Sequence, residues 1–145
     1  MTKQMVDTIS TQNEPLLEMA QERLMLDAFL VKNSNIHARD NHGRNALFWA
    51  IKTSHKHNTH LLLNHNIDLM VQPNYHALFH TIVSNNFEIF LLLLEFGENI
   101  NMTDEENKTL LMTAVEEENV MMVRYLINHG VNLNAQDIDG LTALD

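Results

Sequence analysis

The sequence contains no cysteine, two prolines, four glycines and one tryptophan in 145 residues. Without cysteine, neither a disulfide framework nor a thiolate metal site can form, and this composition fits a reducing compartment. Four glycines are too few for a glycine-rich phosphate-binding loop, and neither a GxSxG nor an HExxH pattern is present. We therefore expect a protein that is not an enzyme and that binds no cofactor.

Long apolar runs and basic residues are also scarce. The longest apolar runs, such as residues 89–94, fall far short of the roughly 20 residues that a membrane-spanning helix needs, and the first residues do not resemble a secretory signal. Nine Lys and Arg face 19 Asp and Glu, a net charge of −10. This charge repels phosphate, so nucleic acid does not suit as a partner. We expect a soluble chain in the cytoplasm, or in a host cytosol if it is a translocated effector.

Residues 104–136 contain the best-formed pattern of the chain. Thr109 is suited to cap the start of a helix whose apolar stripe lies within residues 110–115. Glu118 and Asn119 interrupt the stripe, since asparagine suits a turn or a cap. Residues 120–127 follow as a second, more apolar helix. Gly130 then suits a left-handed helix end. Two such short helices cannot bury their own apolar faces, so this unit needs neighbours.

The unit recurs along the chain. Leu111 is repeated as Leu144, Leu78 and Leu47, with spacings of 33, 33 and 31 residues. The text around these leucines reads NALFWAI, HALFHTI, TLLMTAV and TALD. A fixed period of this length indicates a solenoid of stacked repeats. We therefore expect the four leucines to occupy equivalent inward positions in successive layers.

With its 33-residue period and the pattern G-x-N-x-L-x-x-A at residues 43–50, the chain resembles the ankyrin repeat family over roughly residues 20–145. This resemblance implies an all-α fold, an α-solenoid of stacked helix-turn-helix repeats with hairpin loops. The family's T-P-L-H signature has lost its Pro in every repeat. Asn33 and Asn66 stand where the family has a glycine after the second helix, and Asn tolerates the left-handed backbone needed there.

The repeat pattern divides the chain into six segments. We expect a polar arm at residues 1–13, a capping helix pair at 14–39, ankyrin-like repeats at 40–70, 71–103 and 104–136, and a partial terminal repeat at 137–145 that exposes apolar surface. In the first repeat, Asn58 and Thr59 stand where apolar residues belong, so we expect a short or frayed second helix. Residues 87–96, with the sequence FEIFLLLLEF, should form the most buried helix.

Charge is unevenly distributed. Residues 1–56 hold seven basic and six acidic residues, a net of +1, whereas residues 57–145 hold two and thirteen, a net of −11. In the resembled family the hairpin tips and the first helix of each repeat form a concave binding wall. The residues at these positions, which are the predicted partner-binding residues, are Asn41, His42, Arg44, Lys52, Thr53, Gln72, Asn74, Tyr75, Ser84, Glu105, Glu106, Lys108, Glu116 and Glu117. The acids suit a partner with a basic patch, or they only keep the surface solvated.

Several further side chains have two interpretations. Six of the nine histidines lie between His55 and His80, but without cysteine or nearby carboxylates they predict no metal site, even though His57 and His60 could share a helix face. His80 itself is either a partner contact or a half-buried polar group. Trp49 is either a core residue or an exposed anchor.

Tyr75 and the methionines complete the set of candidates. Tyr75 occupies a hairpin position that is normally exposed, so it is a candidate hot spot for binding. Met25, Met112 and Met122 have the spacing of core residues, and methionine fills irregular gaps in cores.

These observations favour a non-catalytic protein-protein interaction module that binds a partner protein on the concave face of an ankyrin solenoid. A rigid stack of helix pairs can dock a partner at little conformational cost. Three alternatives stay open: an inhibitor or immunity-type protein that neutralises a toxin or an enzyme, the repeat part of an adaptor or translocated effector, and a protein that self-associates through its unfinished end.

Overall fold

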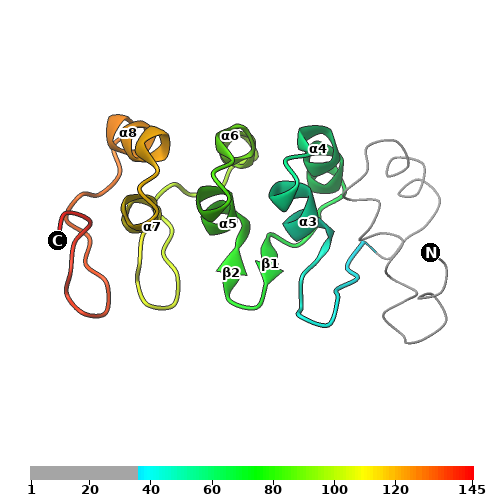
Figure 1. Cartoon of the computed structure of the whole chain (residues 1–145), viewed down its shortest axis with the longest axis horizontal. Helices are drawn as coiled ribbons and strands as arrows, with labels where there is room; N and C mark the ends of the chain where they lie inside the picture. Colours follow the sequence, from blue (N-terminus) through cyan, green and yellow to red (C-terminus); the bar gives the residue numbers. More distant parts are fainter. Residues whose placement is uncertain (1–35) are drawn as a thin grey trace. The chain divides into compact units, whose positions relative to one another are not determined.

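The computed structural model describes residues 36–145, and within this range it contains six helices and two short strands (Figure 1). The predicted arm at residues 1–13 and nearly all of the predicted helix pair at residues 14–39 lie outside this range, as do Met25 and Asn33. The described residues divide into two compact units, with the boundary between Pro73 and Asn74. The predicted all-α class is confirmed in both units.

The first unit contains one helix pair, α3 (Ala46–Lys52) and α4 (Lys56–Asn64), followed by the strand β1 (Met70–Gln72). The side chain of Asn45 begins α3 by accepting a hydrogen bond of 3.1 Å from the backbone N–H of Phe48. Helix α3 packs against both α4 and β1. The apolar side chains of this contact, Leu47 and Leu62 among them, are fully buried.

The second unit contains two helix pairs. In Figure 1 the first helices of the two pairs form one layer and their second helices form a second layer. It begins with the strand β2 (Tyr75–His76), and the helices are α5 (Ala77–Val83), α6 (Phe87–Glu95), α7 (Leu110–Glu116) and α8 (Val120–Asn128). Helices α5 and α7 pack side by side, and each packs against the second helix of its own pair. Between the second helices, Tyr125 meets the rings of Phe87 and Phe90 edge-on, with centroids 5.7 Å apart in both cases.

Short polar side chains begin three of the four helices of the second unit. Thr109 caps α7 as predicted, because its hydroxyl accepts the backbone N–H of Met112 at 3.1 Å. Asn86 and Asn119 cap α6 and α8 in the same way. Side-chain acceptors at this position satisfy N–H groups that the first turn of a helix leaves unpaired.

Residues with positive φ recur at equivalent positions of successive repeats. All ten residues with positive φ in the described range fall into three series with spacings of 31 and 33 residues. They are Gly43, Asn74, Asn107 and Gly140 at the hairpin tips, Ser54, Asn85 and Glu118 between the two helices of a pair, and Asn66, Gly97 and Gly130 after the second helix. The left-handed backbone predicted at Gly130 and at Asn66 is confirmed. Three of the four marker leucines, Leu47, Leu78 and Leu111, are at most 3% exposed.

The fourth marker leucine contradicts the prediction, because Leu144 is 83% exposed. Residues 141–145 form a turn in which the Asp145 carboxylate accepts the backbone N–H of Thr142 at 2.8 Å. Ile138 and Leu141 are also exposed, so the prediction of apolar surface on residues 137–145 is confirmed.

Two predictions about individual helices are wrong. Helix α4 is not shortened: it has nine residues, as α6 and α8 do. Asn58 and Thr59 are fully buried in it, and the Thr59 hydroxyl donates to the carbonyl of His55 at 2.9 Å. A hydroxyl that is satisfied within its own helix can be buried at little cost.

The most buried helix among those described is α5 rather than α6. Six of the seven residues of α5 are buried, compared with four of the nine in α6. Helix α5 is contacted by β2, α6 and α7, so neighbours cover several of its sides. The apolar content of α6 therefore exceeds what its position in the second layer can bury.

Candidate partner-binding surface

Three of the predicted residues in the second unit meet around a buried histidine. The Tyr75 hydroxyl oxygen lies 3.3 Å from Nδ1 of His80, and Ser84 Oγ lies 3.4 Å from the same nitrogen. His80 and Ser84 are one helical turn apart, which places them on the same face of α5. Glu117 lies close enough for its charge to act on the Tyr75 hydroxyl. The side chains of Tyr75, His80, Ser84 and Glu117 therefore form one polar cluster, the tyrosine cluster.

Burial in the tyrosine cluster bears on the predictions made for His80 and Tyr75. His80 is only 5% exposed, so it is a buried rather than a half-buried polar group and offers little surface for contact. Tyr75 was predicted to be exposed, but it is half-buried. Its ring packs edge-on against His80, with centroids 5.3 Å apart. Part of the Tyr75 side chain remains exposed to solvent.

Burial, together with the negative charge of Glu117, raises the pKa of Tyr75 to about 12. The ordinary value is 10.0, so the fold favours the neutral phenol. Tyr75 therefore stabilises the fold fully below the unfolded-state pKa, and this contribution is lost as the pH rises through the folded-state value.

Replacing Glu117 by Gln is expected to lower the pKa of Tyr75 while leaving it above the ordinary value, because burial is the larger cause and is unchanged. Ultraviolet absorbance of tyrosinate measures this titration. The variant Tyr75→Phe identifies which of the two transitions belongs to Tyr75, since Tyr125 is the other tyrosine of the chain. An identical Tyr75 titration in Glu117→Gln would contradict the placement of the two side chains.

Two of the predicted residues pair with each other instead of remaining available. Lys108 Nζ lies 2.9 Å from a carboxylate oxygen of Glu116, and the hydrogen bond to Glu116 raises the pKa of Lys108. Both side chains reach solvent, so this ion pair contributes little to stability. This pair neutralises the charge of Glu116, so the negative charge of the tyrosine cluster comes from its own member Glu117.

Glu105 and Glu106 lie at an exposed hairpin tip that Asp104 organises. The Asp104 carboxylate accepts the backbone N–H groups of Glu106 at 2.8 Å and of Lys108 at 2.9 Å. The same arrangement recurs at Asp40 and Asp137, each of which accepts the N–H groups two and four residues further on. This role of the three aspartates was not predicted, although an aspartate three residues before a left-handed Gly or Asn signals it.

The predicted residues of the first unit are held mostly by local interactions. Arg44 Nε forms an ion pair of 2.8 Å with Asp40, and the Arg44 guanidinium lies 4.6 Å from the centre of the Trp49 ring. Trp49 is half-buried, which is intermediate between its two interpretations. Burial acts to raise the pKa of Asp40, but hydrogen bonds from Arg44 and from the N–H of His42 outweigh it and hold the pKa below its usual value.

Of the other predicted residues between positions 41 and 74, some side chains are hydrogen-bonded to the backbone and others are exposed. The Thr53 hydroxyl donates to the carbonyl of Trp49 at 2.7 Å, and Gln72 Nε2 donates to the carbonyl of His42 at 3.3 Å. The side chains that are exposed are Asn41, His42, Lys52 and Asn74. The first unit therefore presents mainly polar and basic groups.

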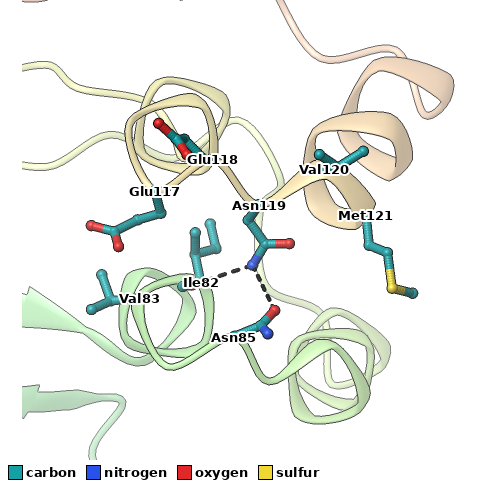
Figure 2. Close-up of a pocket in the computed structure, with 8 residues that line it drawn as sticks. All are labelled: Ile82, Val83, Asn85, Glu117, Glu118, Asn119, Val120 and Met121. Atoms are coloured by element: carbon teal, nitrogen blue, oxygen red, sulfur yellow. Dashed lines mark hydrogen bonds between the residues drawn. The ribbon is translucent and has the colours of Figure 1, made fainter.

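A hollow of about 390 Å³ lies between the α5–α6 turn and the α7–α8 turn of the second unit (Figure 2). We call it the turn groove. The Asn119 amide nitrogen bridges the two turns, donating to the carbonyl of Ile82 at 3.4 Å and to Asn85 Oδ1 at 3.1 Å. Glu117 was predicted as a partner residue and Asn119 as a turn or cap residue, but the groove was not, because it requires two turns from different repeats.

Within residues 36–145, no group of three or more His, Asp or Glu side chains is arranged to hold a metal ion. His57 and His60 are both exposed on α4, and His60 Nδ1 lies 3.1 Å from the amide nitrogen of Asn64. In the same part of the chain, no helix has the length and apolar character required to cross a membrane.

Known proteins resemble this chain over most of its length. A family model described as ankyrin repeats (3 copies) matches residues 16–104 and 78–145. An ankyrin repeat protein of Rickettsia bellii is 33% identical over 84% of this chain, which spans 17% of that protein. Two ankyrin repeat proteins of fowlpox virus are 26% and 32% identical over 91% and 70% of this chain, which spans 33% of the first and 72% of the second.

Proposed function

The chain belongs to the ankyrin repeat family, and from this premise we propose that it is a non-catalytic module that binds a partner protein on the concave face of its repeats. Ankyrin repeats generally serve as protein-protein interaction modules. The binding residues would be the predicted set on the first helices and hairpin tips, with Tyr75, Glu105, Glu106 and Glu117 as the main contacts in the second unit.

The observation that carries this proposal is an aromatic side chain beside excess negative charge. Tyr75 is half-buried at the start of α5, next to the Glu117 carboxylate. Residues 74–145 contain two basic and twelve acidic residues, and one of the two basic residues, Lys108, is already paired. Tyrosine is enriched among the side chains that dominate binding energy, and charge complementarity selects the partner and speeds its association.

The partner chemistry that fits is a protein with a basic patch. An unpaired acid at an interface is stabilised by an opposite charge and destabilised by a like one. Neutralising a basic toxin or enzyme, or acting as the repeat part of an adaptor or effector, would be special forms of this binding. The absence of cysteine supports a reducing compartment, such as the cytoplasm, as its place of action.

Reversing the charge of two acids at the end of α7, Glu116→Lys with Glu117→Lys, is expected to weaken partner binding by about tenfold. The partner is the protein that the immobilised chain captures from its native lysate, and its affinity is measured by surface plasmon resonance. The matched control is Glu88→Lys with Glu95→Lys, which makes the same change of charge at exposed positions of the second-layer helix α6.

Circular dichroism should show the same helical content in both double variants. If the control weakens binding as much as the first pair does, net charge and not the first-helix surface determines affinity. Undiminished binding by the first pair, or capture of no protein at all, would contradict the proposed function.

A further inference from the structure

Beside the tyrosine cluster, the turn groove exposes three apolar side chains in one place. Val83 is 46% exposed, Val120 is 62% exposed and Met121 is 59% exposed, and all three line this hollow. Single exposed apolar residues are ordinary on protein surfaces. Three that line one concave surface indicate a site that gains free energy when another molecule covers it.

The groove has a fixed base. Asn119 is 9% exposed and is held from three sides: its Oδ1 accepts the N–H of Met122 at 3.3 Å, while its amide nitrogen donates to Ile82 and Asn85. Figure 2 shows Val83 and Glu117 on one side of Asn119, and Val120 and Met121 on the other. Because these bonds join the two turns, the groove needs little rearrangement to accept a ligand, which favours binding.

The charge of the groove selects its occupant. Glu117 and Glu118 are exposed at its rim, and no Lys or Arg is among its lining residues. A nucleic acid or an anionic lipid surface would meet only negative charge here. A second copy of the chain is also disfavoured, since residues 74–145 carry two basic and twelve acidic residues and like charges repel.

We propose that the turn groove is a second docking site, which holds a protein segment presenting an apolar side chain next to a lysine or arginine. The apolar side chain lies against Val120 and Met121, and the basic group pairs with Glu118. This proposal rests on the proposed function, because it assumes that the chain binds proteins. It adds a contact outside the concave face and specifies that the partner carries an apolar residue next to a lysine or arginine.

The test selects a random peptide library on the full 145-residue chain, with removal of peptides that also bind the double variant Met121→Ser with Glu118→Lys. Peptides that remain depend on the groove, and we expect them to share an apolar residue adjacent to Lys or Arg. Neither substituted residue belongs to the set assigned to the concave face, so the selection separates the two sites.

Affinities of the selected peptides provide the second measurement. Met121→Ser should weaken binding by about tenfold or more, whereas Met70→Ser, which changes an exposed methionine of the first unit, should leave it unchanged. Glu118→Lys should weaken binding more than Glu95→Lys does. If no peptide remains, or if the remaining peptides lack the basic-apolar pair, the groove is not a docking site, while the result with Glu116 and Glu117 still decides the proposed function independently.

Discussion

Replacing Leu111 by alanine is expected to lower the free energy of unfolding by about 3 kcal/mol, whereas the same replacement at Leu144 should change it by less than about 0.5 kcal/mol. The two leucines stand 33 residues apart at the same repeat position. Leu111 is 3% exposed and Leu144 is 83% exposed. Removing a buried leucine loses apolar burial and leaves a cavity, while removing an exposed one loses almost nothing.

Urea unfolding followed by circular dichroism measures both losses. Leu78→Ala is a second buried reference in the same unit, since Leu78 is fully buried in α5, and its loss should be similar to that of Leu111→Ala. The pair Leu111 and Leu144 thus tests burial with the chemistry of the substitution held constant. Equal losses at the two positions would show that Leu144 is covered in solution, contrary to the structure.

Replacing Asn119 by alanine is expected to lower the free energy of unfolding by about 2–3 kcal/mol, which is the second largest effect we predict. This side chain caps α8 and joins the α7–α8 turn to the α5–α6 turn through two further hydrogen bonds. Alanine would leave the Met122 N–H without the Asn119 acceptor, whereas the Ile82 carbonyl would keep the Asn85 N–H at 3.1 Å. Buried polar groups that lose a partner keep the full cost of their desolvation.

Two milder substitutions separate the cap from the bridge between the turns. Asn119→Ser keeps an acceptor for the first turn of α8 but cannot reach Ile82 or Asn85, so its loss should be about half that of alanine. Asn85→Gly removes only the acceptor at Asn85 and preserves the left-handed backbone there, so it should cost less than about 1 kcal/mol. If serine is as harmful as alanine, the cap contributes nothing and the bridge accounts for the whole effect.

Features that depend on a few neighbouring residues were predictable from the sequence. Thr109 caps α7 because its hydroxyl reaches a backbone N–H three residues away. Asn66 and Gly130 adopt the left-handed backbone because short polar or absent side chains permit it. The repeat period, the resemblance to a known family and the acidic character of the second unit also follow directly from the order and types of residues in the sequence.

Burial was not predictable at several positions, because it depends on how many neighbours an element has. The apolar sequence of α6 predicted that it would be the most buried helix, but α5 is more buried. Asn58 and Thr59 predicted a frayed helix, but both are enclosed in α4. Tyr75 was expected to be exposed, but its ring rests on His80.

The order of the helices, their caps and turns, and the family were determined by the sequence itself, since each is encoded by residues close together in the chain and repeated at a fixed spacing. Only the tertiary structure decided which of these side chains meet: the tyrosine cluster and the turn groove each combine α5 or its following turn with the end of α7, about 33 residues further on. Helix periodicity specifies which face of a helix is apolar, but the packing of one repeat on the next specifies which polar groups share that face.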